Sequence, residues 1–270
     1  MGGSNSKAEL HQALSQELNI TSDDANLVIL EANDTKTALD VWTDAFQKDP
    51  MMCWVGGLEH NNPPASTKTA RVGIARYMLS WINDDLLNGR RGFTIGIRNS
   101  QQELVGAMSM APSTHAFMGI WDTIRMVVKN GRPPMDIGSE KEQYCDNAME
   151  RLNALAVIDK ARDRQMNVEG KHAKWLYLQT IGVHTDYQGK GKYGSKMLRF
   201  IQQAATSMNA AIYLETESKE NVSMYQHFGF ETLEELSVSV PGDDRQDATL
   251  VMYLMRWSPP SNGKNLKTLR

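Results

Sequence analysis

One stretch, residues 175–230, constrains the fold of this chain more than any other. It begins with an apolar, β-rich run, Trp175–Val183, which predicts a buried strand. A turn rich in glycine and lysine follows, and then a helix whose apolar residues recur at a spacing near 3.6, which keeps one face apolar. A second strand begins at Ala211, and a short helix extends from the N-cap Ser218 to the C′ residue Gly229. This order of elements predicts an α/β fold.

The turn between the first strand and the helix has the composition of an anion-binding loop. Glycines let the backbone approach a ligand and direct several N–H groups toward one point. The N-terminus of the next helix favours an anion, and Lys190 and Lys192 add two positive charges. The loop therefore predicts a site for phosphates. An ordinary strand-to-helix turn with solvated lysines is the alternative.

Two common phosphate motifs fit this loop incompletely. Gly189 and Gly194 have P-loop spacing, but Ser195-Lys196 reverses the last two residues and misplaces the lysine, so we reject that motif. The dinucleotide pattern G-x-G-x-x-G fits at Gly189, Gly191 and Gly194. However, five residues separate this pattern from the preceding strand, and only one further strand–helix step follows it. A nicotinamide-dinucleotide oxidoreductase is therefore kept only as a minor alternative.

A third motif explains more of the stretch. Gln188 and Gly191 match the acetyl-CoA motif Gln/Arg-x-x-Gly-x-Gly/Ala, and a one-residue insertion at Lys192 explains why the last glycine, Gly194, comes one place late. Leu-Glu-Thr at 214–216 and N-x-x-M-Y-Q-x-F-G-F at 221–230 follow. The stretch resembles the GCN5-related N-acetyltransferase (GNAT) superfamily. Residues 175–257 look most like puromycin N-acetyltransferase and its relatives, and the Ala-Phe-x-x-Asp-Pro segment at 45–50 agrees with that likeness.

The resemblance implies a GNAT fold, an α/β (α+β) domain with a mixed, mostly antiparallel central sheet that is split at its middle and flanked by helices. We expect this domain at 26–257, with a helical insertion at 113–174 that covers the acceptor side. Residues 1–25 are expected to be a flexible segment, in which Leu10, Leu14 and Leu18 form a short docked helix, and 258–270 a disordered tail. Further expected elements are strands at 27–30, 92–97, 104–110, 234–240 and 248–257 and helices at 35–46, 67–87, 117–128 and 140–164.

Acetyl-CoA is the cosubstrate that the resemblance implies, with no metal. Its pantetheine would lie in the split against the backbone of Ile181 and Val183, and Asn221 would meet the pantetheine arm. Tyr225 would lie beside the sulfur and donate a proton to the leaving thiolate. Core packing is the alternative for Tyr225, and solvent exposure is the alternative for Asn221. The phosphates would bind the loop residues Gln188, Gly189, Lys190, Gly191, Lys192, Tyr193, Gly194 and Ser195.

No general base is evident in the sequence. The side chains available on the central strand, Tyr177 and Gln179, are not bases at neutral pH. We expect His184 to be a solvated loop residue and Glu215 to form structural hydrogen bonds. A water relay or a residue of the insertion is therefore the default.

These patterns predict an N-acetyltransferase that acts on a primary amine, more readily that of a small molecule than of a protein because the acceptor side is covered. A catalytically silent acyl-CoA-binding protein is the main alternative.

The net charge of -3 argues against a nucleic-acid binder, and no apolar run is long enough to span a membrane. Cys53 and Cys145 are far apart, which predicts neither zinc nor a disulfide and suits a cytoplasmic protein. Gly2 and Ser6 fit the N-myristoylation pattern, which would give weak membrane association.

Overall fold

The chain folds around one mixed β-sheet. The structure, a computed structural model, describes residues 3–21, 26–87, 91–115, 148–166, 174–243, 245 and 247–260. Within these residues the sheet has seven strands in the order β1-β2-β3-β4-β5-β7-β6, and every neighbouring pair is antiparallel except β4–β5. The strands are β1 Leu27–Ile29, β2 Phe93–Arg98, β3 Leu104–Pro112, β4 Trp175–Val183, β5 Ala211–Thr216, β6 Glu231–Val238 and β7 Leu250–Trp257.

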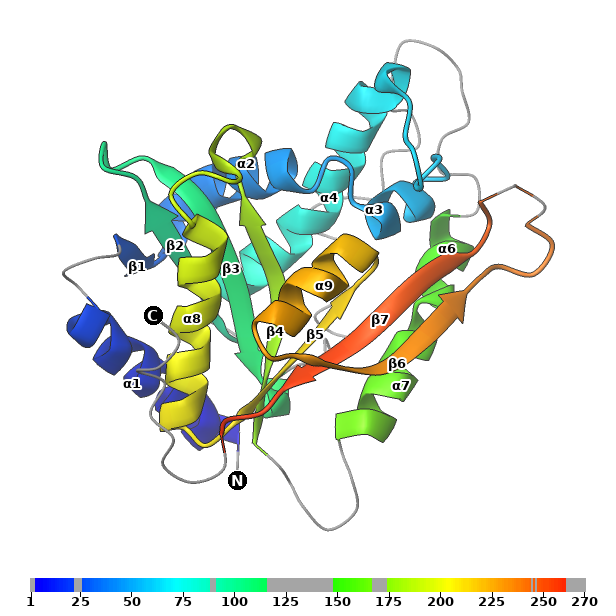
Figure 1. The fold of residues 1–270 in the computed structure, drawn as a ribbon. Helices are drawn as coiled ribbons and strands as arrows, with labels where there is room; N and C mark the ends of the chain where they lie inside the picture. The colour runs from blue at the N-terminus through cyan, green and yellow to red at the C-terminus, as the bar shows by residue number, and fades with distance from the viewer. Residues whose placement is uncertain are drawn as a thin grey trace.

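Helices cover both faces of this sheet (Figure 1). One face carries α1 Gly3–Thr21, α8 Tyr193–Ser207 and α9 Lys219–His227. On the other face, α2 Thr35–Ala45 and α4 Lys68–Leu87 cover the β1–β3 half, and α3 Pro50–Val55, α6 Ala148–Ala154 and α7 Ala156–Met166 lie toward β6 and β7. The apolar stripe predicted for α8 is confirmed, because Met197, Leu198, Ile201, Ala204 and Ala205 are all buried.

The sheet is split between β4 and β5, as the resemblance implied. These parallel strands pair only from Trp175↔Ala211 to Tyr177↔Tyr213, although β4 continues to Val183 and β5 to Thr216. The fold-class prediction is therefore confirmed. A doubly wound dinucleotide domain needs a parallel sheet, so this mostly antiparallel sheet rules out the oxidoreductase alternative.

The N-terminal segment differs from the flexible one that we expected at 1–25. Residues Gly3–Thr21 form α1, in which Leu10 and Leu14 are fully buried in the cluster that includes the apolar face of α8. The expected docked leucines are present, but the helix is much longer than they suggested. A helix of this length is marginal alone, and packing of the leucines on α8 supplies its stability. Gly2, the expected lipidation site, lies outside the described residues.

The region expected as a helical insertion is described only in part. The expected helix at 117–128 lies outside the described residues, and the one at 140–164 is described from residue 148. In that part the expected continuous helix is wrong, because α6 and α7 are separated at Leu155. Leu152, Leu155 and Ile158 around this break all pack in one cluster with β6 and β7. Tertiary packing thus overrides the local helical preference.

Among the described residues, none of the helices combines the length and the apolar character that a membrane span requires.

Helix α1 offers a direct test of its place in the core. We expect Leu14→Ala to lower the free energy of unfolding by about 3–5 kcal/mol, because it removes a fully buried leucine and leaves a cavity. Gln16→Ala, on an exposed position of the same helix, should change it by less than about 0.5 kcal/mol. Chemical denaturation measures both. If Leu14→Ala were as stable as Gln16→Ala, α1 would not be part of the core in solution.

Candidate active site

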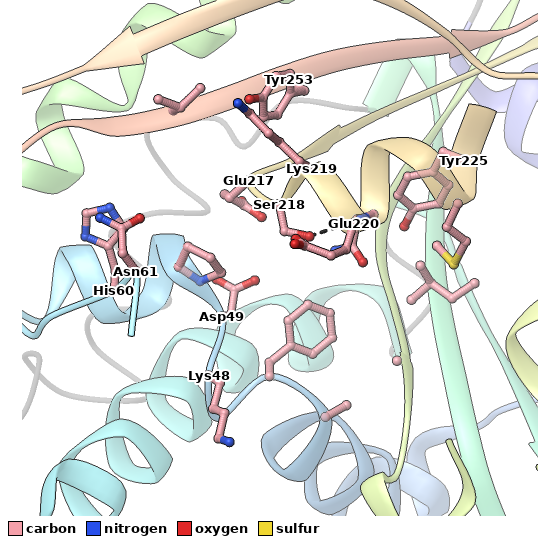
Figure 2. Close-up of a pocket in the computed structure, with 18 of the residues that line it drawn as sticks. Lys48, Asp49, His60, Asn61, Glu217, Ser218, Lys219, Glu220, Tyr225 and Tyr253 are labelled. Carbon is pink, nitrogen blue, oxygen red and sulfur yellow. Dashed lines mark hydrogen bonds between the residues drawn. The ribbon is translucent and has the colours of Figure 1, made fainter. Parts of the chain in front are cut away.

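A cavity of about 940 Å³ occupies the split in the sheet. Its walls come from both faces, with Phe46 and Asp49 from the α2–α3 region and Leu198 and Tyr225 from α8 and α9. Ile181–Val183 of β4 and Val251 and Tyr253 of β7 complete its walls. Because β4 and β5 separate here, the cavity reaches through the sheet, and Figure 2 shows labelled side chains from several elements around it.

The edge of β4 that faces away from β3 borders this cavity. The His184 N–H donates to the Val105 carbonyl at 2.9 Å, and Val183 is paired with Gly106. In an antiparallel ladder this places the N–H and C=O of Val183, and likewise of Ile181, on the edge away from β3. Both residues line the cavity. The structure therefore turns the two predicted backbone contacts toward the split, while Gln188 Nε2 donates to the Val183 carbonyl at 2.8 Å.

The glycine-rich loop joins this edge to α8. Gly189, Gly191 and Lys192 have positive φ values of 71°, 60° and 55°, which fold the loop back before α8 begins. Lys192 is the N-cap of α8 and has a left-handed conformation. The first N–H groups of α8, from Tyr193 onward, have no partner within the helix. The loop thus presents the backbone donors that an anion requires.

The side chains of the loop contribute less than its backbone. Lys190 Nζ donates to the Asp186 carbonyl at 2.9 Å, and both Lys190 and Lys192 are exposed. Gln188 and Gly194 line the cavity, whereas the other predicted loop residues are not among its lining residues. Their phosphate contacts remain predictions.

Helix α9 directs two of the predicted residues into the cavity. The Ser218 hydroxyl caps the helix by accepting from the Asn221 N–H at 3.0 Å, and Asn221 Nδ2 donates to Thr216 Oγ1 at 3.2 Å. Tyr225 lies one turn later on the same face and is only 6% exposed, with its ring 5.5 Å from that of Phe230. Asn221 and Tyr225 both line the cavity.

Tyr225 keeps its proton over a wide pH range. Burial raises the pKa of its hydroxyl, and the nearby Glu217 carboxylate raises it further. The structure records no hydrogen bond for this hydroxyl among the described residues. Figure 2 shows it directed toward the part of the cavity that holds Glu217, Ser218 and Glu220. It is therefore a protonated donor that faces open space.

Sequence reasoning missed a pair of carboxylates in the same cavity. Asp49 caps α3 by accepting from the Met52 N–H at 2.9 Å, and Glu217 follows the end of β5. Burial raises the pKa of Asp49 to about 6, although hydrogen bonds from backbone N–H groups oppose this. Burial and then the Asp49 charge raise the pKa of Glu217 well above its usual range. Among the described residues, neither carboxylate has a Lys or Arg partner.

The position of this pair in the cavity is clear in Figure 2. Asp49 and Glu217 lie between His60 and Asn61 at one end and Tyr225 at the other. Asp49 belongs to the Ala-Phe-x-x-Asp-Pro segment, and Asp followed by Pro is a good start signal for a helix. That signal was available for α3, which we did not predict. Nothing local in the sequence indicated that Glu217 would share a cavity with Asp49.

A histidine closes the far end. His60 is 5% exposed, its backbone N–H donates to Asp247 Oδ2 at 3.0 Å, and its Nδ1 lies 3.2 Å from the same oxygen. Burial lowers the pKa of His60 despite the neighbouring Asp247. This contact ties the loop after α3 to the β6–β7 connection. Within the described residues, no group of three or more His, Cys, Asp or Glu side chains is placed to hold a metal ion.

Four side chains near the cavity that are not expected to act as the base have structural roles. Tyr177 and Tyr213 donate to Glu215 at 2.7 and 2.8 Å, as the expected structural role of Glu215 requires. His184 is half-buried and caps the turn at 185–187, where its Nδ1 accepts from the Asp186 N–H. Gln179 is the unpaired residue of a β-bulge, since Leu178 pairs with Met110 and Thr180 with Ser109.

Comparison with known proteins finds a similarity to one family. Residues 150–232 match the family model described as an acetyltransferase (GNAT) domain. This stretch, about a third of the chain, is similar to a GNAT acetyltransferase domain. The chain is an acetyl-CoA-dependent N-acetyltransferase, with acetyl-CoA as its cosubstrate. No protein of curated function matches the sequence at a significant level.

Two solved structures have a similar fold. Arylalkylamine N-acetyltransferase 2 from Aedes aegypti matches with a TM-score of 0.52 and 9% identity, over 88% of this chain and 100% of that one. A mosquito arylalkylamine N-acetyltransferase like 5b matches with a TM-score of 0.50 and 14% identity, over 87% and 99%. At these identities the likeness concerns the fold.

Two glycines of the loop give a matched test of the acetyl-CoA site. A Cβ at Gly191 would lie 2.7 Å from ring atoms of Tyr193, whereas a Cβ at Gly189 would meet nothing within 4 Å. Both have positive φ, so each alanine carries a similar backbone strain of about 1–2 kcal/mol. We expect Gly191→Ala to weaken acetyl-CoA binding about tenfold or more by displacing the Tyr193 ring at the start of α8, and Gly189→Ala to change it much less. Calorimetric titration measures both, and equal affinities would contradict this placement of the cofactor.

Proposed function

We propose that this enzyme acetylates a primary amine of a small molecule, with the Asp49–Glu217 pair as general base and Tyr225 as general acid. One observation carries the proposal. A single cavity brings the open edge of β4, a protonated tyrosine and two carboxylates of raised pKa together. In the proposed reaction the carboxylates remove a proton from the amine, the strand edge stabilises the oxyanion, and the tyrosine protonates the leaving sulfur.

The reaction uses these groups in sequence. An amine arrives mainly as an ammonium ion, and a carboxylate whose pKa is raised toward neutrality accepts its proton better than an ordinary one. The free amine attacks the acetyl carbonyl, and N–H groups of the split edge at Ile181 and Val183 are available to the oxyanion. As the C–S bond breaks, the Tyr225 hydroxyl protonates the CoA sulfur. Because the Asp49 charge raises the pKa of Glu217, the base is assigned to the pair.

The acceptor end of the cavity favours a small polar amine. Residues 60–63 and the start of β7 line this end. His60, Asn61 and Asn62 supply polar groups in addition to the two carboxylates. We also propose that this chain is most similar to puromycin N-acetyltransferase and its relatives, as the sequence resemblance implied. Both mosquito structures bear the names of amine acetyltransferases, which agrees with an amine acceptor.

The test is acetyl-CoA turnover with a panel of small primary amines and a panel of peptides. We expect release of free CoA thiol, with a product heavier by one acetyl group, for one or more of the small amines. A silent acyl-CoA-binding protein would instead be stabilised against heat by acetyl-CoA and would release no thiol with any amine. That alternative arose from the missing base, a role that the proposal gives to Asp49 and Glu217. Turnover with peptides alone would overturn the small-molecule proposal.

A further inference from the structure

A buried polar network lies where the split in the sheet begins. The last paired residues of β4 and β5 are Tyr177 and Tyr213, and beyond them the two strands separate. At this level Tyr177 of β4 donates to Glu215 Oε2 of β5 at 2.7 Å. The side-chain hydrogen bond thus continues the connection between the strands one step past the end of their backbone ladder.

Other contacts fix the same carboxylate. Tyr213 donates to Glu215 Oε1 at 2.8 Å, and Arg162 of α7 donates to that oxygen at 3.1 Å. The Arg162 guanidinium also lies over the Tyr177 ring, 4.9 Å from its centre, and pairs with Asp159. The side chain of Arg162 is 4% exposed and that of Glu215 is 12% exposed. Buried charges need such pairing, so Glu215 has little freedom to move.

The two tyrosines are permanent donors in this network. Burial raises the pKa of Tyr177 well above its usual value, and the adjacent Glu215 charge raises it further. The same two causes raise the pKa of Tyr213. Both hydroxyls therefore stay protonated over the working pH range, and both hydrogen bonds to Glu215 persist.

The residues that follow Glu215 lead directly into the cavity. Thr216 is 3% exposed and accepts from the side chain of Asn221, while Glu217 and Asn221 line the cavity. A shift of Glu215 would therefore move one carboxylate of the proposed base and one residue expected at the pantetheine arm. The network and the site share the end of β5.

We infer that the hydrogen bond from Tyr177 to Glu215, supported by Arg162, is a positioning device that sets where β4 and β5 separate and thereby shapes the acetyl-CoA site. The inference depends on the proposed function only for the place of acetyl-CoA in the split. Tyr177 and Glu215 act through other residues and do not take part in the chemistry. Through α7, the device also connects the described part of the helical insertion to the split.

The chain offers a closely matched pair of variants. Tyr177→Phe deletes the hydrogen bond that crosses the split, whereas Tyr213→Phe deletes one to the same carboxylate within a single strand. Both keep the aromatic ring. We expect Tyr177→Phe to weaken acetyl-CoA binding about fivefold or more, as the loss of one net hydrogen bond would, and Tyr213→Phe to change it less than about twofold. Calorimetric titration without any amine measures this separately from turnover.

Hydrogen exchange supplies a second measurement that does not depend on the cofactor. Tyr177→Phe should accelerate exchange at the backbone amides of 216–221, and Tyr213→Phe should leave it near the wild-type rate. Equal effects of the two variants on binding and exchange would reduce the network to general packing and overturn the inference. Failure of the wild-type protein to bind acetyl-CoA would refute the cofactor placement instead, and the exchange result would still decide whether Tyr177 positions the end of β5.

Discussion

The double variant Asp49→Asn/Glu217→Gln is expected to lower kcat by about 10²- to 10⁴-fold, the usual contribution of a general base. Both changes keep the size of the side chain and remove its ability to accept a proton at neutral pH. Asparagine also caps helices well, so α3 should remain in place. Steady-state kinetics with saturating acetyl-CoA measures the fall in kcat, and calorimetric titration should show nearly unchanged acetyl-CoA affinity.

Glu220→Gln is the matched control for this pair. Glu220 lines the same cavity but is exposed, and the proposal gives it no part in proton transfer. Its kcat should stay within about threefold of wild type, well below the loss expected for a general base. If the double variant retained wild-type kcat while chemistry limited the rate, the carboxylates would not be the base, and a relay through water would take their place.

The pH dependence of kcat/KM should also reflect ionisation of the two carboxylates. Asp49 has a pKa of about 6 and that of Glu217 is raised further from its usual value, so kcat/KM should rise with pH through this region as the pair loses its protons. In the single variant Asp49→Asn, Glu217 loses a repelling neighbour and its pKa falls. The ascending limb of any residual activity should therefore move to lower pH. An unmoved limb would assign it to another group.

Stability should respond in the opposite sense. A carboxyl group whose pKa is higher in the folded than in the unfolded protein binds more protons when folded, so its contribution to stability is greatest at acid pH and is lost as pH rises through about 6. The double variant has no carboxyl groups at these positions, so it does not lose this stability as pH rises. It should therefore be more stable than wild type at pH 8, and its advantage should shrink toward pH 4 in denaturation experiments.

Local chemistry explains which parts of the site were predictable. Ser218 and Gly229 were predicted as the ends of α9, and the Ser218 cap and the positive φ of Gly229 confirm them. The glycine loop and the Trp175–Val183 strand were likewise predictable, because their residues act on their own backbone. Leu10 and Leu14 indicated a docked helix, but its length depends on α8, a partner far along the chain.

The carboxylate pair shows why the rest was not predictable. Asp49 and Glu217 are ordinary acidic residues in the sequence. Burial of both, and the effect of the Asp49 charge on Glu217, arise only when the fold brings the two residues to one cavity. The same holds for Arg162, whose partners Glu215 and Tyr177 lie on strands that only the fold brings together. A base formed by such long-range proximity leaves no local motif.

Tyr225→Phe is the second change from which we expect a large effect. The substitution keeps the ring, which packs against Phe230, and deletes only the hydroxyl. Because that hydroxyl has no recorded hydrogen bond among the described residues, stability and acetyl-CoA affinity should be nearly unchanged. A thiol with a pKa near 8.5 leaves more readily when it is protonated as the C–S bond breaks, so kcat should fall by about 10²- to 10⁴-fold.

Tyr253→Phe provides the comparison that separates catalysis from packing. Tyr253 lines the same cavity and is as buried as Tyr225, each being 6% exposed, but the proposal assigns it no proton. Its kcat should stay near that of wild type. The raised pKa of Tyr225 also means that its ionisation should not reduce activity below about pH 10, the pKa of an ordinary tyrosine. If Tyr225→Phe kept kcat within about threefold of wild type while chemistry was shown to limit the rate, general acid help from this hydroxyl would be absent, and Tyr225 would serve the core alone.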